Sequence, residues 1–192
     1  MSYQKPKIGL LLQTDLPQAW LDDFQTATGL DRAEIEIRRV YSGSVAGMAL
    51  YLPTAVMVLF ASHYLKGLLT EAGKDHYGSL KTASKGLWHR LKLVRVSAIG
   101  RKAKTEDFDR FQMAFSINGE TSNGNIFKLV LQLNTIDGVA DAGIDSFFDL
   151  IRELNEGTVS PVRMERINSY CAIGGVIVLT IDPQSGDIVA AE

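Results

Sequence analysis

The sequence predicts an α+β fold organised as a single domain over residues 1–192. This length matches one domain of ordinary size, and no stretch rich in Pro, Gly or Ser marks a boundary. Apolar residues recur with the period of strands in some segments and of helices in others, which places two long helices among several short strands. With 46% hydrophobic and 22% charged residues, the composition is globular and excludes disordered and low-complexity classes.

The chain opens with a predicted strand–helix–strand unit. Lys7–Gln13 is a short apolar run typical of a buried strand. Asp15 is the expected N-cap of a helix that Gly29 ends, and Glu34–Tyr41 alternates like a strand. The connection is long enough for the two strands to lie parallel. No glycine lies in the turn between the first strand and the helix, so a dinucleotide-binding fingerprint is absent.

An uncharged segment of 26 residues, Val40–Leu65, follows. We expect two buried strands within it, Met48–Leu52 and Ala55–Phe60, separated by Pro53. The alternative is a membrane segment, because about 20 apolar residues suffice to cross a bilayer and proline is tolerated in membrane helices.

Residues His63–Leu91 read as a long amphipathic helix with an apolar stripe on one face. Gly73 and Gly78 mark the places where this helix could break. A basic ridge occupies the face opposite the stripe and consists of Lys74, Lys81, Lys85 and Lys92.

The third quarter of the chain predicts an antiparallel meander. Its three strand-like runs are Leu93–Gly100, Arg110–Asn118 and Asn125–Leu133, and a loop of turn-forming residues separates the last two. The rest of the chain is predicted to form a second helix at Asp137–Glu156 and a loop at Gly157–Ala172. A C-terminal hairpin of the strands Ile173–Ile181 and Ile188–Ala191 follows.

Charge is segregated along the chain. Residues 61–104 hold 10 basic and 2 acidic side chains, whereas residues 105–192 hold 5 basic and 14 acidic ones. The second helix carries an acidic ridge with one carboxylate every four residues: Asp137, Asp141, Asp145, Asp149 and Glu153. Like charges at this spacing destabilise a helix, so we expect a cationic counterpart. The basic ridge is the candidate, either within the chain or across an oligomer interface. A solvated acidic face and a divalent cation between neighbouring carboxylates are the alternatives.

Histidine and cysteine give no catalytic or metal-binding motif. His63, His76 and His89 are spaced so that they cannot converge on one metal from a continuous helix, so we predict no metal and no cofactor. His76 falls on the apolar stripe and is expected in the core, and Cys171 is expected to be an inert buried thiol. Together they are the weak catalytic candidates, because a cysteine–histidine pair can meet in the fold.

These observations favour a non-catalytic assembly or regulatory module that self-associates, or binds another protein, through the oppositely charged helices. A membrane-active protein that uses the uncharged and basic segments is the second hypothesis, and an enzyme with a site of scattered residues is the third. Nucleic acid is an unfavoured partner, because the basic segment lacks a row of aromatic residues. The first residues lack the apolar core of a secretory signal and Cys171 is the single cysteine, so we expect a cytoplasmic protein.

Overall fold

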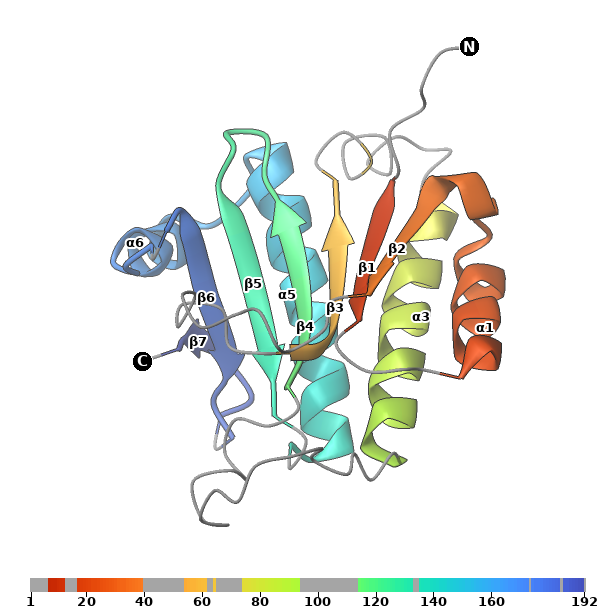
Figure 1. The fold of residues 1–192 in the computed structure, drawn as a ribbon. Helices are drawn as coiled ribbons and strands as arrows, with labels where there is room; N and C mark the ends of the chain where they lie inside the picture. The colour runs from red at the N-terminus through yellow and green to blue at the C-terminus, as the bar shows by residue number, and fades with distance from the viewer. Residues whose placement is uncertain are drawn as a thin grey trace.

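A computed structural model describes residues 7–12, 17–39, 54–61, 64, 74–93, 114–132, 135–172, 174–183 and 185–191. Their strands form one seven-stranded mixed sheet in the order β2-β1-β3-β4-β5-β6-β7 (Figure 1). The strands are β1 (Ile8–Leu12), β2 (Ile35–Arg39), β3 (Thr54–Phe60), β4 (Ala114–Glu120), β5 (Ile126–Leu131), β6 (Val176–Ile181) and β7 (Ile188–Ala190). The helices are α1 (Gln18–Thr28), α3 (Lys74–Leu93), α5 (Asp137–Glu156) and α6 (Pro161–Asn168), with a 3₁₀ turn η1 (Arg32–Glu34). The fold is therefore α+β, as predicted.

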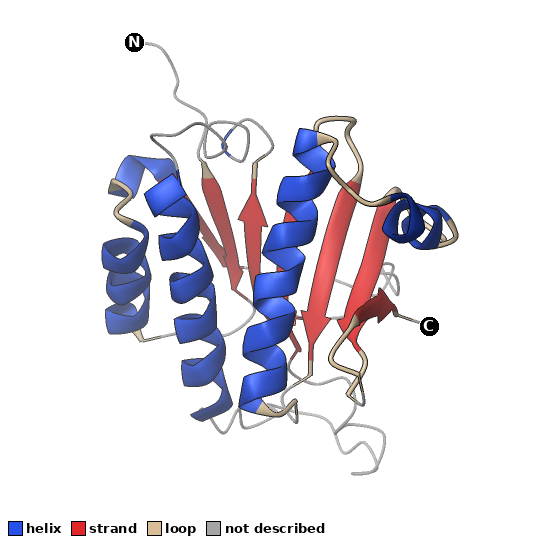
Figure 2. Cartoon of the chain, turned by 180° about the vertical axis from the view of Figure 1, so that it is seen from behind, coloured by secondary structure: helices blue, strands red, loops and turns tan. Residues whose placement is uncertain are grey.

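Helices α1, α3 and α5 lie side by side on one face of the sheet, and α6 lies beside β6 (Figure 2). The main core fills the space between these helices and the sheet. One row of side chains crosses five strands in register, Leu10, Val58, Ile117, Leu129 and Leu179, and each is at most 1% exposed. Because side chains alternate along a strand, this row fixes which residues face the helices and which face the opposite side, called the second face below.

The N-terminal unit matches its prediction in type and topology. β1 and β2 pair in parallel, with Ile8 opposite Ile35. α1 ends at Gly29, whose φ of 64° lies in the left-handed region that glycine adopts without strain. The N-cap prediction was wrong: the position belongs to Pro17, which offers no side-chain acceptor, and Asp15 lies outside the described residues.

Part of the uncharged segment forms the predicted buried strand. Ala55–Phe60 falls within β3, which pairs antiparallel with β1 and parallel with β4. The other predicted strand, Met48–Leu52, lies outside the described residues. Within the described part of the chain, none of the helices is both long enough and apolar enough to cross a membrane.

The long amphipathic helix is described from Lys74 to Leu93 as α3. It continues without a break through Gly78 and Gly86, and the four stripe residues within it, Leu80, Ala83, Leu87 and Leu91, are buried. Its predicted start, His63, and residues 65–73 lie outside the described residues. Leu93 was wrongly assigned to a strand, because the helix carries on through it, and residues 94–100 are likewise not described.

The two hairpins are confirmed by antiparallel pairing of β4 with β5 and of β6 with β7. β6 begins at Val176 rather than at residue 173, because Gly174 and Gly175 take left-handed φ values of 61° and 82° that break an extended strand. The predicted loop over residues 157–172 was wrong in part, since it contains α6. Ser160 caps this helix by accepting a hydrogen bond from the backbone N–H of Arg163, and Pro161 occupies its first turn.

Helix α5 approaches the sheet closely at Gly143. A Cβ added there would lie 1.8 Å from Cδ1 of Ile181 on β6. A similar approach occurs from the sheet side, where a Cβ on Gly119 of β4 would lie 2.9 Å from Cγ1 of Ile151. The two glycines let helix and sheet approach more closely than a methyl group allows, which fixes the height of α5 above β4 and β6.

Candidate functional site

The basic and acidic ridges meet between α3 and α5. Lys81 Nζ lies 2.9 Å from Asp149 Oδ1, and Lys85 Nζ lies 2.7 Å from Asp145 Oδ2. Both ion pairs join residues of the same chain. For these four residues, the cationic counterpart of the acidic ridge therefore lies within the chain.

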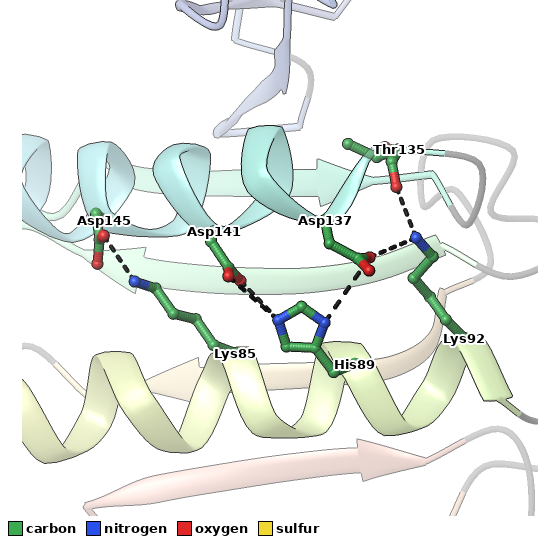
Figure 3. Close-up of polar contacts among 7 residues, drawn as sticks. All are labelled: Lys85, His89, Lys92, Thr135, Asp137, Asp141 and Asp145. Atoms are coloured by element: carbon green, nitrogen blue, oxygen red, sulfur yellow. Dashed lines mark hydrogen bonds and ion pairs between the residues drawn. The ribbon is translucent and has the colours of Figure 1, made fainter.

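Two further residues of α3, His89 and Lys92, extend the row toward the start of α5 (Figure 3). His89 Nε2 lies 3.0 Å from Asp141 Oδ1, and His89 Nδ1 lies 3.8 Å from Asp137 Oδ1. Lys92 Nζ lies 2.5 Å from Asp137 Oδ1 and donates a hydrogen bond of 2.9 Å to the carbonyl oxygen of Thr135. These contacts and the two lysine pairs above form the ion-pair ladder.

The ladder follows from the spacing of the sequence on two antiparallel helices. Residues 81, 85 and 89 rise by four along α3, while their partners 149, 145 and 141 fall by four along α5. Residues four apart lie on the same face of a helix, so each step of one ridge meets one step of the other. The repulsion along the acidic ridge is offset by the cations that face it.

The ladder lies at the protein surface rather than in the core. Its side chains are between 19% and 59% exposed. Ion pairs exposed to this degree contribute about 0–1 kcal/mol each, so the row sets the register of the two helices more than it stabilises the fold. The ammonium of Lys92 holds the pKa of the Asp137 carboxyl below its usual range.

Sequence reasoning did not include His89 in the basic ridge. The spacing of four from Lys81 through Lys85 was present in the sequence, but His89 was considered only as a metal ligand. The fifth carboxylate of the acidic ridge has a cation from another helix: Glu153 Oε2 lies 2.7 Å from Arg163 Nη1 on α6. Lys74 is the first residue of α3, and its side chain lies outside what the structure describes.

An aromatic side chain adjoins the end of the ladder. Tyr77 lies under the Lys81 ammonium, 5.2 Å from the ring centroid, and the guanidinium carbon of Arg152 lies 5.5 Å from the same centroid. Its ring packs edge-on against Phe148, with centroids 5.7 Å apart. Burial, assisted by the Asp149 carboxylate, raises the pKa of the Tyr77 phenol.

The two weak catalytic candidates lie elsewhere, and both predictions of burial were wrong. His76 is exposed, and its ring lies near Gly29 at the end of α1. Cys171 is an exposed free thiol just after α6. Helices α3 and α6 lie on opposite sides of α5 (Figure 2). The structure thus does not bring this pair together. Across the described residues, no group of three or more His, Cys, Asp and Glu side chains is arranged to hold a metal ion.

Strand β2 forms one edge of the sheet and displays charges of both signs. Arg38 Nε lies 2.7 Å from Glu36 Oε1 on the same strand. Between them, Ile37 points to the side of the sheet that carries α1 and is 41% exposed, which is high for an isoleucine. A hollow of about 270 Å³ lies beside this strand against α1, with Ile37 and Asp22 among its lining residues.

The centre of the second face is polar and buried. Asn118 on β4 lies opposite Lys128 on β5, and the two side chains are 8% and 2% exposed. Burial lowers the pKa of the Lys128 ammonium to about 8. The sequence contains a hint of this cluster, since Lys128 interrupts an otherwise apolar strand, but a single lysine in a strand is too common to predict burial.

No protein-family model, curated protein or solved structure matches the chain. Three places in the fold are the candidates for a function: the ion-pair ladder, the β2 edge and the second face.

Proposed function

We propose that this chain is a non-catalytic assembly module that pairs with a second copy of itself along β2. The observation that carries the proposal is the self-complementary sequence Glu36-Ile37-Arg38 on an edge strand. The charged helices, where the sequence had placed association, direct their charges at one another within the chain. We therefore assign association to the edge of the sheet.

An edge strand offers backbone N–H and C=O groups to another strand. Among the described strands, β2 pairs on one side alone, with β1, and lies at the rim of the sheet (Figure 1). A second β2 added at this rim would continue the sheet across the interface, with main-chain hydrogen bonds supplying affinity.

The side chains of β2 match an antiparallel, two-fold arrangement. With the symmetry axis at Ile37, Glu36 of each copy lies opposite Arg38 of the other, and the two Ile37 side chains face each other. Opposite charges in directly facing positions stabilise a strand pair, and each such pair occurs twice in a symmetric interface. Glu36 and Arg38 lie on the second face, whereas Ile37 lies on the helix side.

The hollow beside β2 supports the same arrangement. In this register Arg39 of the second copy lies opposite Ile35, on the side of the sheet that carries α1. There the lining of the hollow includes the carboxylate of Asp22, beside the chain's own Arg32 and Arg39, and this carboxylate would face the incoming guanidinium.

The test is the absolute mass in solution, measured by light scattering after gel filtration over a range of protein concentrations. We expect twice the chain mass of 21.1 kDa. Arg38→Glu puts like charges opposite each other and should give the monomer, and the double variant Glu36→Arg/Arg38→Glu should restore the dimer.

A matched control comes from the ion-pair ladder. Lys85→Glu also reverses one charge, but its pair lies within the chain, so the mass should stay that of a dimer. A monomer at every concentration for the unmodified chain would overturn the proposal. So would a dimer that Arg38→Glu leaves intact.

A further inference from the structure

The hollow beside β2 carries charges of opposite sign that are not paired with each other. Asp22 on α1 and Arg32 on η1 both belong to its lining, and both side chains are exposed. No ion pair joins either of them to another residue in the part of the chain that the structure describes. Each group is therefore able to meet an opposite charge on a small molecule that enters the hollow.

The negative group is held in place by its own helix. Gln18 Nε2 donates a hydrogen bond of 2.9 Å to Asp22 Oδ1, one turn later on α1. A carboxylate accepts up to about four hydrogen bonds, so Oδ2 stays open to a further donor. An ammonium group, which has three N–H donors and a positive charge, satisfies both needs of this oxygen.

The positive side of the hollow suits a carboxylate. A guanidinium such as that of Arg32 binds a carboxylate through two parallel N–H···O hydrogen bonds, which fix its orientation as well as its position. Arg39 at the end of β2 brings a second guanidinium to the same lining. Two cations against one carboxylate favour a ligand that carries a negative charge, while Asp22 favours a positive group on that same ligand.

An apolar surface lies between the charged groups. Ile35 and Ile37 of β2 line the hollow together with Leu21 of α1, and Ile37 is 41% exposed. A hydrocarbon side chain laid against the two isoleucines would remove apolar surface from water. A cavity of about 150 Å³ holds a benzene molecule, so a hollow of about 270 Å³ has room for a somewhat larger ligand.

We propose that the hollow binds a free α-amino acid with an aliphatic side chain. Its carboxylate accepts hydrogen bonds from Arg32, its ammonium donates to Asp22 Oδ2, and its side chain packs against Ile35 and Ile37. A residue within a peptide lacks the free ammonium, the free carboxylate or both, so this combination of groups selects the free amino acid.

The site belongs to one chain, but a second copy would compete for it. In the proposed dimer Arg39 of the second copy faces Asp22, which is the carboxylate that the ammonium of the ligand needs. A bound amino acid should therefore favour the monomer. This competition rests on the proposed function, whereas the binding of the amino acid does not.

The experiment follows the methyl resonances of Ile37 by NMR in the Arg38→Glu variant, whose altered side chain lies outside the lining of the hollow. Leucine should shift them in a saturable manner. Isocaproate lacks the ammonium, isoamylamine lacks the carboxylate and glycine lacks the side chain, so each should bind several-fold more weakly. The methyl groups of Ile144, buried in the core, should not respond. No shift with leucine, or equal binding of any of the three analogues, would overturn the proposal.

Variants in the same background separate the two charges. Asp22→Asn keeps an acceptor for Gln18 but removes the negative charge, and Arg32→Gln removes the guanidinium. Each should weaken leucine binding about three- to tenfold, because a charge-assisted contact at an exposed position is lost. The matched control is Asp23→Asn on the same helix, since that carboxylate pairs with Arg90 instead. Unchanged affinity in both hollow variants, or an equal loss in the control, would contradict the site.

The absolute mass of the unmodified chain, measured by light scattering with and without leucine, distinguishes the two proposals. Saturating leucine should shift a dimer toward the monomer, and leucine should bind Arg38→Glu more tightly than the unmodified chain. A dimer that leucine leaves intact at saturation would contradict the shared use of Asp22. If the unmodified chain is a monomer without ligand, the proposed dimer fails, and equal leucine affinity in both chains would still support the site.

Discussion

Lys85 Nζ and Asp145 Oδ2 lie 2.7 Å apart although 60 residues separate them in the chain. Their contact is one step of a ladder that aligns α3 with α5. The sequence left open whether the acidic and basic ridges meet within the chain or across an interface; the contacts between Lys81, Lys85 and their partners place this meeting between two helices of the same chain.

The first prediction concerns this contact. Lys85→Glu should lower the free energy of unfolding by about 1 kcal/mol, because one pair is lost and a like-charge contact with Asp145 replaces it. Adding Asp145→Lys should recover most of this loss, as measured by urea denaturation. A double variant no more stable than Lys85→Glu alone would show that the pair contributes nothing. Glu165→Lys, a reversal at an exposed position of α6, is the control.

The second prediction tests the close approach of α5 to the sheet. Gly143→Ala should destabilise the fold by about 1–3 kcal/mol, because the new methyl group overlaps Ile181. Ile181→Val removes the nearest atom and should reduce the cost in the double variant. Gly138→Ala on the same helix meets nothing within 4 Å and should stabilise by up to about 1 kcal/mol through helix propensity. Thermal unfolding of the three variants checks the order, and equal effects of the two alanines would refute the packing argument.

The third prediction is a rise of stability with pH. Lys128 releases its proton near pH 8 in the folded chain, against an ordinary pKa of 10.5. Between these values the unfolded chain binds more protons, so the free energy of unfolding should increase with pH, by at most about 1.4 kcal/mol per unit.

Denaturant titrations between pH 8 and 9.5 measure this slope. The upper limit stays below the titration of the tyrosines. Burial raises the pKa of Tyr64 to about 12, so above the ordinary tyrosine pKa of 10.0 the unfolded chain binds fewer protons and the free energy of unfolding falls with pH. Lys128→Met should flatten the slope, and Lys85→Met should leave it unchanged. A slope that survives in Lys128→Met would assign the titration to another group.

The fourth prediction concerns Cys171. As an exposed thiol it should react with Ellman's reagent in the folded protein without denaturant, at one equivalent per chain. Cys171→Ser should change the free energy of unfolding by less than about 0.5 kcal/mol, because little packing is removed. Reaction that requires urea would instead place the thiol in the interior.

Local features of the fold were predictable because local physics decides them. The apolar run of β1, the glycine that ends α1 and the turn between β4 and β5 each depend on a few neighbouring residues. The sheet order was not predictable, since the pairing of β3 with both β1 and β4 joins segments far apart in the sequence. Helix α6 was missed although Ser160 and Pro161 form a capping pattern, because its short apolar face gave no clear period.

The charged residues, too, were predictable where local spacing decides their role and not where long-range packing does. The four-residue spacing of the acidic ridge indicated that a cationic partner was needed, and the structure places a lysine or an arginine against four of the five carboxylates and His89 against the fifth, Asp141. The choice between partners within the chain and across an interface depends on how α3 lies against α5, which no local pattern encodes. His76 shows what the helical wheel could not predict: its position falls on the apolar stripe, but its side chain is exposed near Gly29 at the end of α1.

The central position of the β3–β4 pair has a consequence for the order of folding. The hairpins β4–β5 and β6–β7 join residues close in sequence and close short loops, whereas Val58 and Ile117 meet across a long intervening segment that contains α3. The entropy lost on closing a loop grows with its length, and non-local strand pairs slow folding. We therefore expect the flanks of the sheet to form early and its middle to join late. The helices that carry the ladder would be brought into alignment in that same late step.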